Sequence, residues 1–171
     1  VSPDEVFSEN GKDFFKIKDK KRILVGPSES MSKSKKNIID PEKIIDRFGA
    51  DAVRFFILSD SPPEKDVQWS EQGMLAAYKF VQKFWILHRR IKDEIKNKKR
   101  INKNVNLTIY TNKLIQKYTS SLEKFNMNVL IAYLHETYNF LSKEIEKLDI
   151  KDLKENYSKI LVLMSPILPH L

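Results

Sequence analysis

Serine, lysine and methionine are combined in one short segment of this chain in a way that could bind a polyphosphate. Residues 31–35 read Met-Ser-Lys-Ser-Lys and follow a short apolar stretch at residues 23–25. Ammonium groups stabilise the negative charge that grows as a phosphate leaves, and small hydroxyl side chains can hydrogen-bond the same phosphates. The segment therefore suggests a loop that closes on a polyphosphate.

Two other readings of this segment follow from its composition. A phosphate-binding P-loop needs glycine, four residues, then Gly-Lys-Ser/Thr, and here the fifth residue after Gly26 is Met31, so that motif is excluded. A solvated linker rich in serine and lysine has a similar composition. Composition alone leaves the linker and the phosphate-binding loop both open.

Short elements flank the loop and would position it. Residues 4–26 suggest a small β element, with a turn signal at residues 9–12, alternating apolar residues from 14, and an apolar strand at 23–25. After the loop, Asp40 is expected to cap a helix that ends at Gly49. A second helix is expected over residues 50–59.

The rest of the chain has a helical pattern. Apolar residues recur every three or four positions for some 30 residues from Ser70, which predicts one long helix. Three further helices are expected at about 106–124, 127–147 and 150–164. The fold class is therefore mostly α with a small β element, and four helices form a bundle at the C-terminal side.

Composition limits the classes of function. The chain has 171 residues, 41% of them hydrophobic and none of them cysteine, which excludes disulfides and thiolate metal sites and favours a cytosolic setting. No stretch approaches the ~20 apolar residues of a membrane span, and the first residues do not resemble a signal peptide. We expect no metal site, because His88, His135 and His170 are far apart and lack carboxylates at ligand spacing.

Positive charge is concentrated in one window of the chain. The net charge is +8, and residues 83–103 hold most of the excess. A basic stripe of this kind is typical of a surface that contacts a phosphate backbone, although a solvated helix end has the same composition. The candidate RNA contacts are Arg89, Arg90, Lys92, Lys96, Lys99 and Arg100.

A longer stretch carries a family resemblance. Residues 31–58 resemble the Lys-Met-Ser-Lys-Ser signature of class I aminoacyl-tRNA synthetases, including Asp40-Pro41, residues 49–51 and Arg54 at the family's spacing. The sequence at residues 35–37 and 58–73 is similar to that of the leucyl enzymes of bacterial type. One residue departs from the motif, because Ser30 stands where the family has its first lysine.

The resemblance implies a division into domains. Residues 1–26 would be a small β element at the end of an insertion, and residues 27–69 the C-terminal end of a Rossmann-type catalytic domain. Residues 70–171 would be a helical domain of the anticodon-binding type, cut short at its C-terminus. In leucyl enzymes this bundle is expected to dock on the tRNA body mostly through the backbone of the tRNA.

The resemblance also implies an activity and site residues. Leucine would be activated with ATP, carrying its Mg²⁺, to leucyl-adenylate, and the leucyl group would pass to tRNA(Leu). Lys33 would be the catalytic residue, because it stabilises charge on the departing pyrophosphate. The residues expected to bind ATP are Met31, Ser32, Lys33, Ser34 and Lys35.

Several expectations concern what surrounds this activity. The family's other signature, His-Ile-Gly-His, does not occur in these residues, so we expect a fragment that is inactive alone. We expect the whole enzyme to be a monomer in the cytoplasm. Isoleucyl, valyl and methionyl synthetases remain alternatives, as do a non-catalytic RNA-binding module and a purely structural bundle. Structural readings are also available for four single residues: Asp51 and Arg54 could pair with each other, and Trp69 and Trp85 fit a core or interface better than base stacking.

Overall fold

The computed structural model describes residues 5–10, 13–27, 29–60, 62, 64–97, 101 and 106–171. The chain forms two compact units, residues 1–44 and 45–171. The domain boundaries expected from the sequence, after residues 26 and 69, stay predictions. None of the helices in the described ranges is long and apolar enough to cross a membrane.

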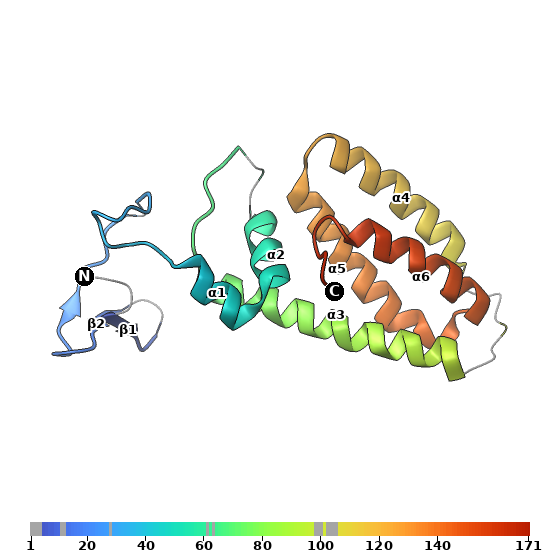
Figure 1. The fold of residues 1–171 in the computed structure, drawn as a ribbon, viewed down its shortest axis with the longest axis horizontal. Helices are drawn as coiled ribbons and strands as arrows, with labels where there is room; N and C mark the ends of the chain where they lie inside the picture. Colours follow the sequence, from blue (N-terminus) through green and yellow to red (C-terminus); the bar gives the residue numbers. More distant parts are fainter. Residues whose placement is uncertain are drawn as a thin grey trace. The chain divides into compact units, whose positions relative to one another are not determined.

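The first unit contains a three-stranded antiparallel sheet in the order β1-β2-β3. Its strands are β1 (Val6–Ser8), β2 (Phe14–Lys16) and β3 (Arg22–Ile23), as Figure 1 partly labels. The strand expected at residues 23–25 is wrong beyond Ile23, since Leu24 and Val25 are exposed. The reason lies in Asp13, the residue that would extend the ladder: its N–H donates to Asn10 and its carbonyl accepts from Ser8.

Two short helices follow the loop, as expected. Helix α1 spans Pro41–Phe48, and the Asp40 carboxylate accepts a hydrogen bond from the Glu42 N–H. Gly49 has a φ of +82°, a left-handed conformation that ends the helix at little cost for glycine. Helix α2 spans Ala50–Asp60.

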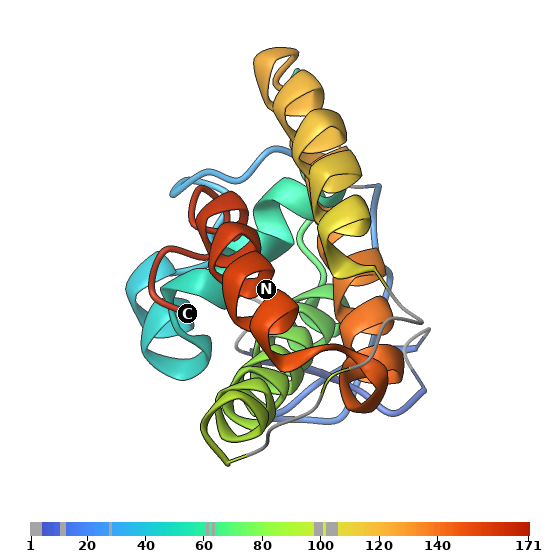
Figure 2. The ribbon, with the colours of Figure 1, turned by 90° about the vertical axis from the view of Figure 1, so that its right-hand side faces the viewer.

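Four longer helices complete the second unit. They are α3 (Glu71–Asn97), α4 (Leu107–Glu123), α5 (Met127–Glu144) and α6 (Ile150–Met164), with a 3₁₀ turn, η2 (Ile145–Lys147), after α5. The expected bundle is confirmed, and Figures 1 and 2 show these helices packed side by side. Helix α2 packs on α3 and α5. A Cβ on Gly73 would come within 2.8 Å of the Phe56 ring, so this glycine permits the close approach of α2 and α3.

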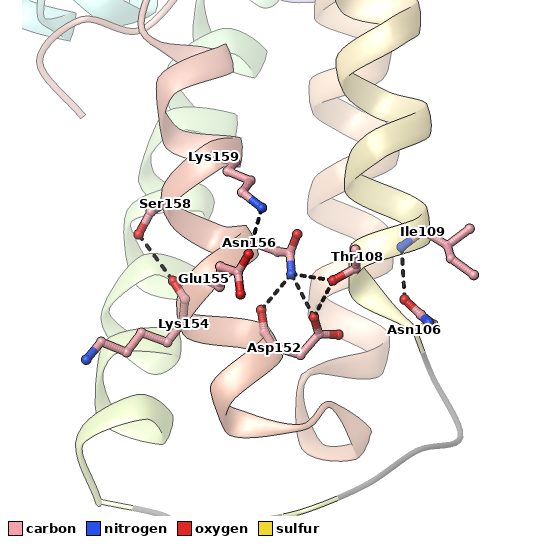
Figure 3. A network of polar contacts seen from close by, with 9 residues as sticks. All are labelled: Asn106, Thr108, Ile109, Asp152, Lys154, Glu155, Asn156, Ser158 and Lys159. Carbon is pink, nitrogen blue, oxygen red and sulfur yellow. Dashed lines mark hydrogen bonds and ion pairs between the residues drawn. The ribbon is translucent and has the colours of Figure 1, made fainter.

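A half-buried polar network joins the start of α4 to α6 (Figure 3). The Asp152 carboxylate accepts hydrogen bonds from the Leu107 N–H at 3.0 Å, the Thr108 hydroxyl at 2.6 Å and the Asn156 amide at 2.7 Å. Asn106 caps α4 through the Ile109 N–H. These bonds satisfy N–H groups that a helix N-terminus otherwise leaves unpaired.

The signature residues of α2 hold the C-terminal segment of the chain. Asp51 accepts hydrogen bonds from the His170 backbone N–H at 3.0 Å and lies 2.8 Å from its ring Nδ1. Arg54 donates to the carbonyls of Pro166 and Ile167. The suggested pairing of Asp51 with Arg54 was therefore wrong, because both bind this segment, and His170 has a carboxylate neighbour although none lies at ligand spacing in the sequence. Sequence spacing missed both because the partners are more than 110 positions apart.

Candidate functional site

The serine–lysine loop is a structured turn within the first unit. Residues 33–36 form the turn, which the Lys36 N–H closes by donating to the Lys33 carbonyl at 3.2 Å. The Ser32 hydroxyl accepts from the Lys35 N–H at 3.3 Å and lies 3.2 Å from the Ser34 hydroxyl. Lys36 has a φ of 54°, a left-handed conformation that costs a non-glycine residue about 1–3 kcal/mol and needs support from its surroundings.

Asn37 supplies part of that support. Its Oδ1 accepts a hydrogen bond from the Ser32 N–H at 2.9 Å, and its Nδ2 donates to the Ser30 carbonyl at 3.4 Å. One half-buried side chain thus ties the end of the turn to its beginning. Sequence reasoning used Asn37 only to recognise the leucyl pattern, and the Asx-type preference of asparagine for local backbone bonds was the signal that could have identified its role.

The two lysines of the motif have different surroundings. Lys35 Nζ lies 2.6 Å from the Glu29 carboxylate, and the hydrogen bond and charge of Lys35 lower the pKa of Glu29. Lys33 is exposed and has no ion-pair partner in the part of the chain that the structure describes. An ammonium group without a carboxylate partner is free to bind a phosphate, so Lys33 is the more available of the two.

The remaining loop residues are also accessible. The Met31 side chain is 48% exposed. Because it is apolar, its burial against a ligand or another part of the enzyme would be favourable. Ser32 is half-buried, and Ser34 and Lys35 are exposed. Of the five predicted ATP-binding residues, Lys33, Ser34 and Lys35 lie in the turn, and Met31 and Ser32 directly precede it.

The basic stripe lies on α3, except for two members outside the described residues. Arg89, Arg90, Lys92 and Lys96 are exposed on this helix, whereas Lys99 and Arg100 fall in a segment that the structure does not describe. Arg90 pairs with Glu146, and the other three described cations have no such partner among the residues that the structure describes. Positions 85, 89, 92 and 96 share one face of the helix, because they follow a three- and four-residue spacing.

The two tryptophans differ in environment. Trp69 is half-buried and its ring meets Phe56 edge to face, with centroids 5.4 Å apart, in agreement with a core residue. Trp85 is 47% exposed, so of the two expected environments, core or interface, the core is wrong and the interface stays a prediction. Its helix position explains the difference, because it lies on the face of α3 that carries the cations.

Metal binding has no built site in the described ranges. No group of three or more His, Cys, Asp or Glu side chains there could hold an ion. The loop offers ammonium and hydroxyl groups rather than carboxylates, which suits phosphate oxygens and not a bare divalent cation.

Comparisons with known proteins identify relatives of this chain. A family model described as tRNA synthetases class I (I, L, M and V) matches residues 23–70, the stretch that contains the loop, α1 and α2. A leucine–tRNA ligase of Rickettsia massiliae is 38% identical over 99% of this chain and 20% of its own length. A leucine–tRNA ligase of Bartonella tribocorum is 36% identical over the whole chain and 21% of its own length.

A solved structure supports the fold. The crystal structure of the ternary complex of Agrobacterium radiobacter K84 agnB2 LeuRS with tRNA and LeuAMS matches with a TM-score of 0.72 and 24% identity, over 82% of this chain and 19% of that one. The chain therefore spans about a fifth of the length of the relatives it matches. Residues 23–70 match the class I tRNA synthetases, and the chain as a whole corresponds to a segment of leucine–tRNA ligases.

Proposed function

We propose that this chain is the part of a leucine–tRNA ligase that supplies a loop for ATP and pyrophosphate and a helical surface for tRNA(Leu). The observation that carries the proposal is the exposed Lys33, without an ion-pair partner among described residues, on a turn that Ser32 and Asn37 organise. That turn lies inside the stretch that matches the family model.

The proposed reaction has two steps. The leucine carboxylate attacks the α-phosphorus of ATP, the bond to the β-phosphate oxygen breaks, and leucyl-adenylate and pyrophosphate form. A ribose hydroxyl of tRNA(Leu) then attacks the leucyl carbonyl and AMP leaves. Lys33 acts in the first step by binding the charge that develops on pyrophosphate more tightly in the transition state than in the ground state.

The other loop residues position the nucleotide. The hydroxyls of Ser32 and Ser34 orient the phosphates, and Met31 packs against whatever covers the closed loop. Lys35 contributes less than Lys33, because a phosphate must first compete with the Glu29 carboxylate. Mg²⁺ bound to the ATP phosphates would neutralise part of their charge, while the loop residues hold the phosphates.

The helical surface docks the RNA. Cations of α3 neutralise phosphates of the tRNA backbone, a contact that needs no base recognition.

We place the whole enzyme in the cytoplasm as a monomer.

The function is tested by leucine-dependent exchange of pyrophosphate into ATP by a full-length ligase that contains this segment. Exchange with leucine, and at least tenfold less with isoleucine, valine or methionine, is the expected result. Equal or faster exchange with one of those three would assign the segment to another amino acid. Exchange by the 171-residue chain alone would overturn the expectation that it needs the rest of the enzyme.

A second candidate is a non-catalytic RNA-binding module. Ser30 favours it, since the first ammonium group of the family motif is missing. A full-length protein that binds tRNA but catalyses no exchange with any of the four amino acids would establish this candidate and refute the first.

A further inference from the structure

A pocket of about 580 Å³ lies beside Trp85 on the second unit. The middle of α3 lines it through Val81, Gln82, Trp85 and Ile86, and Asp51, His170 and Leu171 complete the lining. Trp85 is 47% and Ile86 67% exposed. A concave, mostly apolar surface with a half-exposed indole is suited to a flat ligand.

The Trp85 ring is held in place before any ligand binds. It stacks on His88 with ring centroids 5.3 Å apart and an interplanar angle of 15°. His88 in turn is fixed by Tyr157, whose hydroxyl lies 2.9 Å from the His88 Nδ1. Burial, together with the charge of Lys92, lowers the pKa of His88, so at neutral pH the stacked imidazole is uncharged. A fixed aromatic ring loses little conformational entropy on binding.

Charge on the same helix face identifies the kind of ligand. Arg89, Lys92 and Lys96 follow Trp85 by four, seven and eleven positions, so all four side chains lie on one face over about 16 Å. None of the three cations has an ion-pair partner in the described part of the chain. An occupant that matches this surface carries a flat aromatic group next to several negative charges.

From this arrangement we infer that Trp85 stacks with an unpaired base of a bound RNA, while Arg89, Lys92 and Lys96 hold the neighbouring phosphates. An RNA strand carries a base on every phosphate-linked unit, and stacking on an aromatic side chain tolerates any base. The inference rests on the proposed docking of tRNA and adds a base contact to it.

The two tryptophans allow a direct optical test in the 171-residue chain. Trp69→Phe removes the other indole and leaves Trp85 as the single tryptophan. Trp69 packs on Phe56 and precedes α3, the helix that carries the cations. Titration with tRNA(Leu) is expected to quench its fluorescence. A blunt RNA duplex of similar charge, which has no unpaired bases, is expected to bind without quenching.

Affinity measurements supply the second test. Trp85→Leu is expected to weaken tRNA binding about 5- to 150-fold at fixed salt, with the salt dependence unchanged, and Trp85→Phe to recover part of the loss. Because Trp85 is exposed, both variants are expected to stay folded, and helical circular dichroism checks this. The fluorescence test needs no change at Trp85.

Failure of this inference is distinguishable from failure of RNA docking. If the triple variant Arg89→Gln, Lys92→Gln, Lys96→Gln loses affinity while Trp85 is neither quenched nor needed, the cations bind RNA and the stacking inference is wrong. Equal quenching by the blunt duplex would also overturn it. If the triple variant binds tRNA as well as the wild type, the docking proposal itself fails.

Discussion

The cations of α3 predict how steeply RNA affinity depends on salt, because only cations without an ion-pair partner are free to bind phosphates. Arg89, Lys92 and Lys96 have no ion-pair partner among the described residues, whereas Arg90, on the same helix, pairs with Glu146. A cation that neutralises a phosphate releases condensed counterions, and its contribution therefore appears in the dependence of affinity on salt. We expect the triple variant Arg89→Gln, Lys92→Gln, Lys96→Gln to flatten this dependence and Arg90→Gln to leave it nearly unchanged.

The magnitude can be worked out per cation. Each phosphate contact contributes about −0.7 to −0.9 to the slope of log K against log salt, so three contacts contribute about −2.1 to −2.7. Raising salt fourfold, from 50 to 200 mM, should then cost about 20- to 40-fold in affinity through these three side chains alone. The triple variant should lose that share.

The assay is tRNA(Leu) binding by the 171-residue chain, followed by fluorescence anisotropy of labelled RNA at five salt concentrations. Arg90→Gln is the matched control, because it removes one positive charge from the same helix. A slope that falls as much in Arg90→Gln as in each single variant of the other three would refute the reasoning from ion pairing. It would mean that net charge, rather than free cations on one face, determines binding.

Three further predictions concern the loop and the core. Asn37→Ala should lower the kcat of leucine-dependent exchange about tenfold or more in a full-length ligase and increase trypsin cleavage after the loop lysines, because it releases the tie to Ser32; unchanged cleavage would contradict this. Tyr118→Phe should raise the free energy of unfolding by about 1 kcal/mol, because the buried hydroxyl has no hydrogen-bond partner among the described residues. Burial raises the pKa of Tyr118 to about 12, so wild-type stability should fall as pH rises from 10 to 12, and urea titrations of the phenylalanine variant should lack this fall. Asp152→Ala should cost about 2–3 kcal/mol by urea denaturation, because it leaves the Leu107 N–H and the Thr108 hydroxyl without their acceptor; a loss below 0.5 kcal/mol would contradict it.

Helix boundaries were the part of this fold that sequence reasoning could predict well. Their signals are local: Asp40 and Gly49 bracket α1, and the three- to four-residue apolar spacing after Ser70 marks α3. The strand at residues 23–25 was over-extended, because its length depends on whether Asp13 has free backbone groups for pairing. Apolar composition carries no information about that partner.

Within the candidate site, the loop could be predicted but the inequality of its lysines could not. Lys33 and Lys35 look alike in the sequence, and only the position of Glu29, six residues before Lys35, separates them. Asp51 and Arg54 were recognised by spacing, yet their partners at the C-terminal segment are brought close only by the tertiary fold. Trp85 could not be assigned to either a core or an interface from the sequence, because an apolar residue on a periodic helix does not reveal which face is covered.

The most direct test of the proposed catalytic role compares Lys33→Ala with Lys35→Ala in a full-length ligase that contains this segment, by the kcat of leucine-dependent ATP–pyrophosphate exchange. Each of the two variants removes one lysine ammonium group, and the two positions are only two residues apart. We expect Lys33→Ala to lower kcat at least about 100-fold, as loss of a group that stabilises developing charge commonly does, and Lys35→Ala to lower it less than about tenfold. An effect of Lys35→Ala equal to or larger than that of Lys33→Ala would contradict the assignment of the catalytic charge to Lys33.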